Sequence, residues 1–414
     1  MNIFFFSRLF IFLFFLLQLL QPSSLTAADD KTTIPLKKFF NVSKIDFNKK
    51  ISGHSSTLLS DGKLLIIGGK DETGLLSSIS IYDASTNQFK DASAKLITPR
   101  FDHTTIILSD NKVLIAGGSD TTGPISSLEI YDPVSDTITS LSSSLSTPRS
   151  GHTATLLSDG RVLITGGTDS SGISLDSAEI YDPKTQTFSL LSQKMTISRS
   201  NHTATLLPDG RVIIIGGINI NNTITLLNSA EVFNPASETF TPLLAVLKKG
   251  RFGHSATLLP DGRILTALGS GYDYDEDDDD DDKDTNKIKP YNNAELYDPI
   301  TDTFIKIAGK ITDKRYDHTA NLLTDARIII IGGEGKKKDD KDKGILSTGV
   351  ILTPVVVDST APNISSITIN NNPPSLATGP LTHDPLTLIR FSEPIRVTTL
   401  RSDTILLKDD KGAA

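Results

Sequence analysis

Short apolar runs bounded by Gly, Asp and Asn recur at a regular interval along most of the chain. The clearest unit reads HTATLLSDGRVLITGG and starts at His152. Relatives of it start at five further histidines: His54, His103, His202, His254 and His318. The intervals between successive histidines are nearly equal, except for a longer one between His254 and His318. β-branched residues dominate the runs, and none has the i, i+3, i+4 apolar spacing of an amphipathic helix, so the pattern predicts strands.

Each of these six units, numbered one to six in chain order, contains four strand signals separated by turn residues. In unit three they are HTATLL from His152, RVLITGG (161–167), SAEIYD (177–182) and a strand that starts near Thr187. The Asp-Gly pair between the first two is a hairpin signal, because Gly accepts the positive φ of a tight turn. A four-strand meander with a period of about 50 residues predicts the blade of a β-propeller.

The units resemble kelch repeats. The resemblance rests on a double glycine after the second strand: Gly68, Gly69, Gly117, Gly118, Gly166, Gly167, Gly216, Gly217, Gly332 and Gly333. It also rests on an aromatic residue in the third strand: Tyr82, Tyr131, Tyr181, Phe233 and Tyr297. Kelch units usually carry Trp in the fourth strand, whereas this chain has four Phe and one Ile there: Phe89, Ile138, Phe188, Phe240 and Phe304. Unit five also departs from the pattern, because Leu268 replaces the first glycine.

The spacing of the fourth strand predicts how such a propeller closes. The fourth-strand aromatic position precedes the histidine of the next unit at a constant spacing, as Phe89 precedes His103. Phe40 stands at the same spacing before His54, although no unit precedes it. Unit six has a third strand at 347–354 and no fourth-strand motif after it. We therefore predict that a strand at 36–45 completes unit six and closes a six-bladed ring, which removes its open edges.

The two ends of the chain carry different signals. Residues 1–28 hold Arg8, an apolar run from Leu9 to Leu20 and small residues before Ala28, which predicts a secretory signal peptide cleaved after Ala28. An uncleaved anchor is the alternative, but the run is shorter than the ~20 residues of a spanning helix. We expect a secreted, cell-surface or periplasmic protein with no membrane segment after cleavage.

Residues 358–414 resemble the bacterial Ig-like domains of surface-layer-type proteins. The resemblance rests on Thr360-Ala361-Pro362, on FSEPI (391–395) and on the closing Asp-Lys-Gly. An Ig-like sandwich needs about 100 residues, so we expect a partial sandwich. The predicted organisation is all-β: signal peptide 1–28, six-bladed kelch-type β-propeller 29–357 and partial Ig-like domain 358–414.

Composition narrows the chemistry. The 414 residues include no Cys and no Trp. Without Cys there can be no disulfide, thiolate-held zinc or thiol nucleophile, nor the Cys–Tyr copper site that the galactose oxidase type of kelch enzyme needs. The formal net charge is −8, and residues 273–284 alone hold ten acids and one Lys, so the remainder is about +1. That balance argues against nucleic-acid binding.

The six repeat histidines suggest a ring of imidazoles. Two nitrogens on one zinc lie within about 4 Å of each other, and equivalent atoms around a six-fold ring lie farther apart. We therefore predict a structural role, in which each histidine bonds loop backbone at the start of its strand.

An arginine stands three residues before five of these histidines: Arg100, Arg149, Arg199, Arg251 and Arg315. The third strands carry Glu129, Glu179, Glu231 and Glu295. Unit one lacks both partners, which predicts a structural Arg–Glu pair within a unit or between neighbours. Since unit six has Val350 in the glutamate position, one arginine stays unmatched in either arrangement. The alternative is a basic rim that binds an acidic ligand.

The acidic run lies between the second and third strands of unit five. Asp275, Asp277 and Asp279 are its candidate calcium ligands, since Ca²⁺ takes six to eight oxygens. The run lacks the spaced Gly of a calcium loop, which favours a solvated loop that only attracts cations. No other cofactor is predicted. A contact with a partner through residues 336–338 is a further possibility.

No Ser–His–Asp or paired-carboxylate pattern stands out from the repeat, so no catalytic residue is predicted. The sequence favours an exported propeller that binds a surface polysaccharide or protein, because propeller loops make a rigid and variable rim. A glycan-active hydrolase or lyase, and a structural assembly module of the cell surface, are the alternatives.

Overall fold

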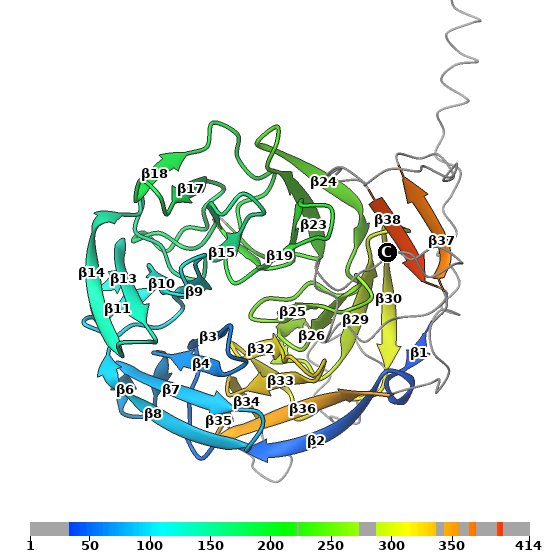
Figure 1. The fold of residues 1–414 in the computed structure, drawn as a ribbon, viewed down its shortest axis with the longest axis horizontal. Coiled ribbons are helices and arrows are strands. Elements are labelled where there is room, and N and C mark those ends of the chain that lie inside the picture. Colours follow the sequence, from blue (N-terminus) through cyan, green and yellow to red (C-terminus); the bar gives the residue numbers. More distant parts are fainter. Residues whose placement is uncertain are drawn as a thin grey trace, which may run out of the picture. The chain divides into compact units, whose positions relative to one another are not determined.

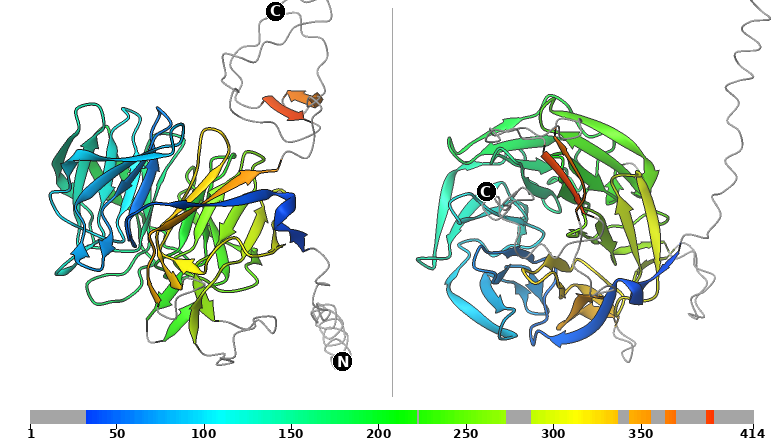
Figure 2. Two further views of the ribbon diagram at one scale, coloured as in Figure 1. Left: turned by 90° about the horizontal axis from the view of Figure 1, so that it is seen from below. Right: turned by 45° about the vertical axis from the view of Figure 1, so that its right-hand side comes forward.

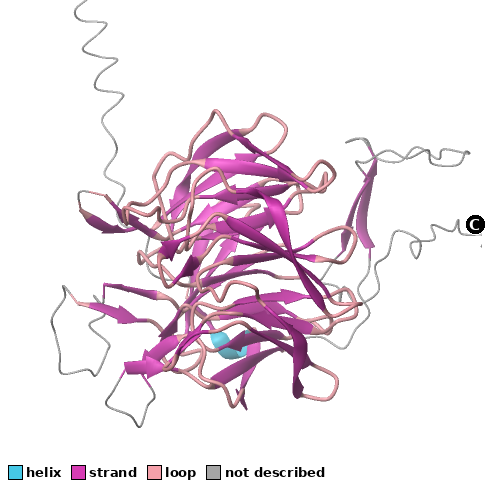
Figure 3. Ribbon diagram, turned by 90° about the vertical axis from the view of Figure 1, so that its left-hand side faces the viewer, coloured by secondary structure: helices cyan, strands magenta, loops and turns pink. Residues whose placement is uncertain are grey.

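The computed structural model describes residues 33–221, 223–272, 287–336, 343–355, 364–369 and 387–391. Within these ranges the chain consists of strands and one 3-10 turn, η1 (Leu36–Lys38), as Figure 3 shows. The predicted all-β class is confirmed. The described part of the chain holds no helix that is long and apolar enough to cross a membrane.

Six antiparallel sheets correspond to the six units and are numbered like them (Figure 1). Units one to five each supply four strands of their sheet, and unit six supplies three. Sheet 1 holds β3 (Ser55–Leu58), β4 (Leu64–Ile67), β7 (Ser78–Asp83) and β8 (Gln88–Lys95). Sheet 2 holds β9 (Thr104–Ile107), β10 (Val113–Ala116), β13 (Ser127–Asp132) and β14 (Thr137–Ser144). Sheet 3 holds β15 (Thr153–Leu156), β16 (Val162–Thr165), β17 (Ala178–Asp182) and β18 (Thr187–Leu190).

Sheet 4 holds β19 (Thr203–Leu206), β20 (Val212–Ile215), β23 (Ser229–Asn234) and β24 (Thr239–Val246). Sheet 5 holds β25 (Ser255–Leu258), β26 (Ile264–Ala267), β29 (Ala294–Asp298) and β30 (Thr303–Ala308), with β1 (Ile34–Pro35) parallel to β30. Sheet 6 holds β32 (Thr319–Leu322), β33 (Ile328–Ile331), β36 (Thr348–Pro354) and β2 (Phe40–Asp46).

The outer strand of sheet 6 therefore comes from the other end of the described chain. β2 runs antiparallel to β36, from Phe40 opposite Pro354 to Asp46 opposite Thr348 (Figures 1 and 2). The strand starts later than the predicted residue 36, because 36–38 form η1. The first strands of successive sheets contact one another, and β32 of sheet 6 contacts β3 of sheet 1.

Shorter hairpins connect the second and third strands of five units: β5 (Lys70–Asp71) with β6 (Gly74–Leu75), β11 (Ser119–Asp120) with β12 (Gly123–Pro124), β21 (Ile218–Ile220) with β22 (Ile224–Leu226), β27 (Ser270–Tyr272) with β28 (Ile288–Pro290), and β34 (Glu334–Lys336) with β35 (Lys343–Ile345). β31 (Arg315–Tyr316) pairs with β34. In the predicted Ig-like segment, the described residues form one hairpin, β37 (Ile364–Ile369) with β38 (Thr387–Phe391). The predicted signal peptide and the rest of that segment lie outside the described residues.

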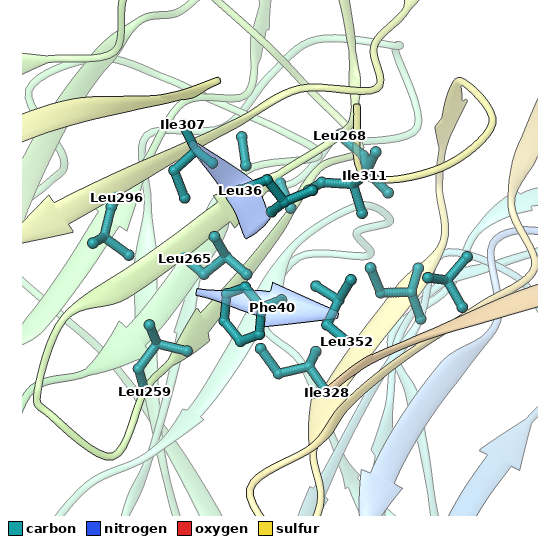
Figure 4. Packing of buried hydrophobic residues seen from close by; sticks show 14 residues of the cluster. Leu36, Phe40, Leu259, Leu265, Leu268, Leu296, Ile307, Ile311, Ile328 and Leu352 are labelled. Atoms are coloured by element: carbon teal, nitrogen blue, oxygen red, sulfur yellow. The ribbon is translucent and has the colours of Figure 1, made fainter. Parts of the chain in front are cut away.

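The core lies between neighbouring sheets. Successive residues of a strand point to opposite faces, so Val162 and Ile164 of β16 pack in the cluster shared with sheet 2, while Leu163 packs in the cluster shared with sheet 4. This explains why the second strand of each unit is apolar throughout rather than alternating. Figure 4 shows the cluster between sheets 5 and 6, which includes Leu36 and Phe40 from the N-terminal segment.

Phenylalanine takes the place of the missing tryptophan. In sheet 3 the Phe188 ring lies 4.8 Å from that of Tyr181, centroid to centroid, and the equivalent pairs in sheets 1, 4 and 5 lie 4.7–4.9 Å apart. Each pair fills the outer part of its sheet.

The double glycine is needed for close packing. Both glycines have left-handed φ, 61° at Gly166 and 98° at Gly167. A Cβ on Gly166 would lie 2.3 Å from the Arg199 carbonyl oxygen of the next unit. A side chain there would therefore separate neighbouring sheets.

Candidate functional site at the central cavity

The residues immediately before the repeat histidines form a hydrogen-bonded circuit. They are Gly53, Asp102, Gly151, Asn201, Gly253 and Asp317, and all have left-handed φ of 50–60°. The N–H of each donates to the carbonyl oxygen of the one before it at 2.7–2.9 Å, and the Gly53 N–H donates to the Asp317 oxygen at 3.2 Å. These residues and the six histidines line a cavity of about 120 Å³, called the central cavity below.

Glycine alternates with Asp or Asn around this circuit for a steric reason. A Cβ on Gly53 would lie 2.7 Å from Asp102 Oδ1, and one on Gly253 would lie 2.3 Å from Asp317 Oδ1. Asn201 is placed in the same way over Gly151, where a Cβ would lie 2.0 Å from its Oδ1. Each glycine thus makes room for the polar side chain of the following unit.

Each repeat histidine bridges two sheets. Its Nε2 bonds a hydroxyl on the first strand of the preceding sheet, at 2.8 Å for His103 with Ser55 Oγ and 2.9 Å for His54 with Thr319 Oγ1. The equivalent partners of His152, His202, His254 and His318 are Thr104, Thr153, Thr203 and Ser255. At Nε2 the partner is thus a hydroxyl rather than the expected loop backbone, because the ring points across to the neighbouring strand. At His152, backbone hydrogen bonds with Ala116 and Arg149 also contribute.

These imidazoles stay uncharged at neutral pH. Burial lowers the pKa of His54, His152 and His254 to about 3, and it lowers the pKa of the other three well below the usual value. In the described part of the chain, no three His, Asp or Glu side chains are placed to hold a metal ion. The geometry agrees with a structural use of the histidines.

The interpretation of the arginines as a ligand-binding rim is wrong. The side chains of Arg100, Arg149, Arg199, Arg251 and Arg315 are 0–1% exposed, so they cannot reach a ligand. Four of them pair with the glutamate of their own unit at 2.6–2.9 Å, which decides between the two predicted arrangements. Each arginine also donates to the carbonyl oxygen at the first position of the double-glycine motif, at 2.8–3.0 Å. The arginine therefore ties three segments of one unit together.

A polar network lies beside the central cavity, between sheets 6 and 1. Glu334 on β34 accepts hydrogen bonds from the Tyr316 hydroxyl at 2.6 Å and from Ser52 Oγ at 3.2 Å, and it pairs with Lys70 Nζ at 2.9 Å. Lys70 is held in place because its backbone pairs with that of Ser52, next to Gly53 in the circuit. Lys70, Asp102, Tyr316, Asp317 and Glu334 are called the mouth cluster below.

The two aspartates of the mouth cluster lie where the charged form of a carboxyl group is disfavoured. Burial raises the pKa of Asp102 to about 6, and the charge of Glu334 adds to this while Lys70 opposes it. Burial raises the pKa of Asp317 well above its usual range, and the charges of Asp102 and Glu334 act in the same direction. Among the described residues, no donor forms a hydrogen bond with either carboxylate. Glu334 differs, because hydrogen bonds from Tyr316 and Lys70 outweigh burial and lower its pKa.

An open pocket adjoins this network. It has a volume of about 360 Å³ and is lined by Lys70, Asp71, Tyr316, Glu334, Gly335, Gly344 and Ile345. Aromatic rings contact two of its lining residues: Lys70 Nζ lies 5.3 Å from the Phe101 ring centroid, and the Phe252 ring packs edge-on against Tyr316 with centroids 5.9 Å apart. Carboxylates, a hydroxyl, an ammonium and aromatic rings at one pocket are suited to a polar organic ligand.

Sequence reasoning missed the mouth cluster. Its signal was the residue before each histidine, which alternates between Gly and Asp or Asn from unit to unit. The candidate calcium ligands Asp275, Asp277 and Asp279 lie outside the described residues, as do 337 and 338.

Comparisons with known proteins agree with the fold. Residues 42–217 match the family model described as the KLHDC2/KLHL20/DRC7 Kelch-repeats domain. A solved structure titled "Structure of YjhT" matches with 14% identity and a TM-score of 0.58, covering 73% of this chain and 99% of that one. No curated protein matches. Residues 42–217 thus match a kelch-repeat family model, and the structural match supports the fold of a kelch propeller.

Proposed function

We propose that residues 29–357 form a six-bladed propeller closed by β2, and that the protein is an exported module that binds a surface polysaccharide or protein. Two observations support closure: the pairing of β2 with β36 and the backbone circuit that returns from Gly53 to Asp317. The predicted signal peptide supports export, and the Ig-like resemblance of 358–414 suits a spacer at the cell surface.

The mouth cluster carries the proposal of binding. Two carboxylates without hydrogen bonds among the described residues lie near each other in the lining of the central cavity, and burial raises the pKa of both, so their charged forms are disfavoured there. The repeat offers a less costly solution at the same position, since Gly53, Gly151 and Gly253 occupy it in the alternate units. Perturbed groups at a pocket are typical of binding or active sites.

An array of glycans and matrix proteins tests the proposal. The protein is residues 29–414, applied with calcium and with a chelator, and we expect retention on a defined set of glycans or proteins. Loss of retention in chelator would assign a role to the acidic run at 273–284. Retention on nothing would contradict the binding function and favour the assembly module.

Deletion of residues 29–46 tests closure. The deletion removes β2 and exposes the edge of β36, so we expect a sharp fall in melting temperature. Deletion of 273–284 is the matched control and should leave the melting temperature unchanged. If the first deletion melts like the intact chain, the closure proposal fails.

A glycan-active enzyme is the second candidate, because a carboxyl group with a raised pKa can act as a general acid. Asp317 is the group in question. The test is turnover of any glycan retained on the array. Turnover abolished by Asp317→Asn with retention preserved would favour an enzyme over a binding module.

A further inference from the structure

The mouth cluster holds more negative charge than the fold neutralises. Asp102, Asp317 and Glu334 carry three carboxylates, and Lys70 is the single ammonium that interacts with all of them. Lys70 pairs directly with Glu334, whose remaining acceptors are taken by Tyr316 and Ser52. The two aspartates are left without a donor among the described residues, so the site has room for a second positive group.

The histidines do not supply that charge. His54, His103 and His318 are the imidazoles adjacent to this side of the circuit, and burial keeps all three neutral at pH 7. Asp71 lines the pocket, but its carboxylate accepts hydrogen bonds from Thr73 and the Gly74 N–H. Among the described residues that act on the charges of Asp102 and Asp317, Lys70 is thus the one positive group, and Glu334 is negative.

The site is confined to one side of the central cavity. The residues two positions before the histidines are aromatic in units two, five and six, namely Phe101, Phe252 and Tyr316. In units one, three and four they are Ser52, Ser150 and Ser200, next to Gly53, Gly151 and the neutral Asn201. An aromatic residue and a circuit aspartate therefore coincide in units two and six, on either side of unit one.

Lys70 shows that an ammonium group suits this environment. Its Nζ lies 2.9 Å from Glu334 Oε1 and 5.3 Å from the centroid of the Phe101 ring. A carboxylate together with an aromatic face is the combination that recognises ammonium groups in general. The free carboxylates of Asp102 and Asp317 offer the same chemistry to a ligand.

We propose that the mouth cluster binds the primary ammonium group of an amino sugar through Asp102 and Asp317, which line the central cavity, with the sugar ring extending toward the pocket lined by Lys70, Tyr316 and Glu334. This inference rests on the proposed binding function and names its ligand class. The pocket volume of about 360 Å³ is at the lower end for small-ligand sites, so it fits one sugar residue rather than a folded partner. Carboxylate oxygens also accept hydrogen bonds from sugar hydroxyls.

Isothermal titration calorimetry with glucosamine tests the inference. N-acetylglucosamine is the matched ligand control, since it keeps the ring and removes the charge. At pH 7.5 we expect binding of glucosamine only. Because a proton competes with the ammonium for Asp102 and Asp317, we expect at least fivefold weaker binding at pH 5, whereas Lys70 and Glu334 keep their charges.

The double variant Asp102→Asn/Asp317→Asn removes both charges with little change in shape. Asn201 already occupies the equivalent circuit position with φ of 50°, so asparagine is compatible with this backbone. We expect at least tenfold weaker binding of glucosamine, which corresponds to about 1.4 kcal/mol. The control is Asn201→Gly on the neutral side, which should bind glucosamine within twofold of the parent. Thermal melting of each variant checks that it is folded.

Several outcomes would overturn the inference. One is equal binding of glucosamine and N-acetylglucosamine, and another is unchanged glucosamine binding by the double variant. Binding of a lysine-containing peptide, but not of glucosamine, would replace the sugar with a protein side chain. Calorimetry with calcium and magnesium chloride tests the last alternative. If the parent protein binds a metal ion but not glucosamine, and the double variant does not bind the metal ion, the cluster is a metal site.

The proposed function can fail separately. Array retention that the double variant preserves would leave the binding function intact and overturn the ligand class. A blank array together with charge-dependent glucosamine binding would overturn the proposed binding of a surface polysaccharide or protein and leave the ligand class intact.

Discussion

Val350 stands where four other units have a glutamate, and its replacement by glutamate should stabilise the protein. The strand register is equivalent, since Val350 lies opposite Ile330 as Glu179 lies opposite Ile164. Arg315 is therefore buried without the carboxylate that its counterparts have. Its Nε and the Thr312 hydroxyl have no hydrogen-bond partner among the described residues. In unit four the corresponding Thr196 hydroxyl donates to Glu231 Oε2 at 3.0 Å.

The expected gain follows from these missing partners. Burial lowers the pKa of Arg315 to about 10, which corresponds to roughly 3 kcal/mol of lost preference for the charged form. A hydrogen bond to Thr312 adds about 1 kcal/mol. Two costs oppose this gain. Losing the burial of the valine side chain costs about 1.5 kcal/mol, and dehydrating the new carboxylate costs about as much again. We expect Val350→Glu to gain about 1 kcal/mol, and Val350→Gln, which has the same shape without charge, to lose about 2 kcal/mol.

Urea unfolding of residues 29–414 at pH 7 measures both variants, and thermal melting should move in the same direction. The same substitutions in an Arg315→Met background complete a double-mutant cycle. There Val350→Glu should become strongly destabilising, because the carboxylate would be buried alone. The reasoning is refuted if Val350→Glu unfolds at or below the urea midpoint of Val350→Gln, or if its effect is the same with and without Arg315.

Three further predictions concern the repeated framework and the mouth cluster. Glu179→Ala should cost about 3–5 kcal/mol in urea unfolding, because Arg149 would remain buried and unpaired; a loss below about 1 kcal/mol would contradict this. Gly166→Ala should lower the melting temperature sharply, because the new Cβ would lie 2.3 Å from a carbonyl oxygen. Gly172→Ala is the control: Gly172 also has a positive φ, but a Cβ there would meet no atom within 4 Å, so the substitution should cost only about 1 kcal/mol. Asp102→Asn should raise stability by about 1–2 kcal/mol above pH 6 and have little effect near pH 4. The sign follows because a raised folded-state pKa makes the ionised carboxyl destabilising above that pKa, and melting temperatures from pH 4 to 8 would show it.

The repeated parts of the fold could be predicted from the sequence because their causes are local. Asp-Gly turns, double glycines and continuous apolar second strands each act within a single unit, and the repetition of that unit made the pattern clear. The sequence predicted that the arginines pair with the glutamates, but not whether they pair within a unit or between neighbouring units, since both arrangements fit the same spacing. The distances at Arg149 and Glu179 decide it.

The candidate site could not be predicted in this way. Asp102, Asp317 and Glu334 belong to units two and six, and they come together because sheet 6 contacts sheet 1, through β32 with β3 and through the Gly53 N–H to the Asp317 carbonyl oxygen. The partners of the histidines were missed for a related reason. Each hydroxyl, such as Ser55 for His103, lies in the preceding unit, and a single-unit view points to nearby backbone instead.

Departures from the repeat separate function from framework in this chain. A residue present in every unit, such as the histidine, makes the same Nε2 bond to the preceding sheet six times, which is the pattern of a framework residue. Val350 also departs from the repeat, but the groups that it leaves without partners, Arg315 Nε and the Thr312 hydroxyl, are buried. This departure therefore costs stability and creates no binding site. Asp102 and Asp317 depart where their side chains line the open central cavity, so a ligand that enters the cavity can offset their cost. That contrast is the reason to place binding at the mouth cluster rather than at the six-fold ring of imidazoles.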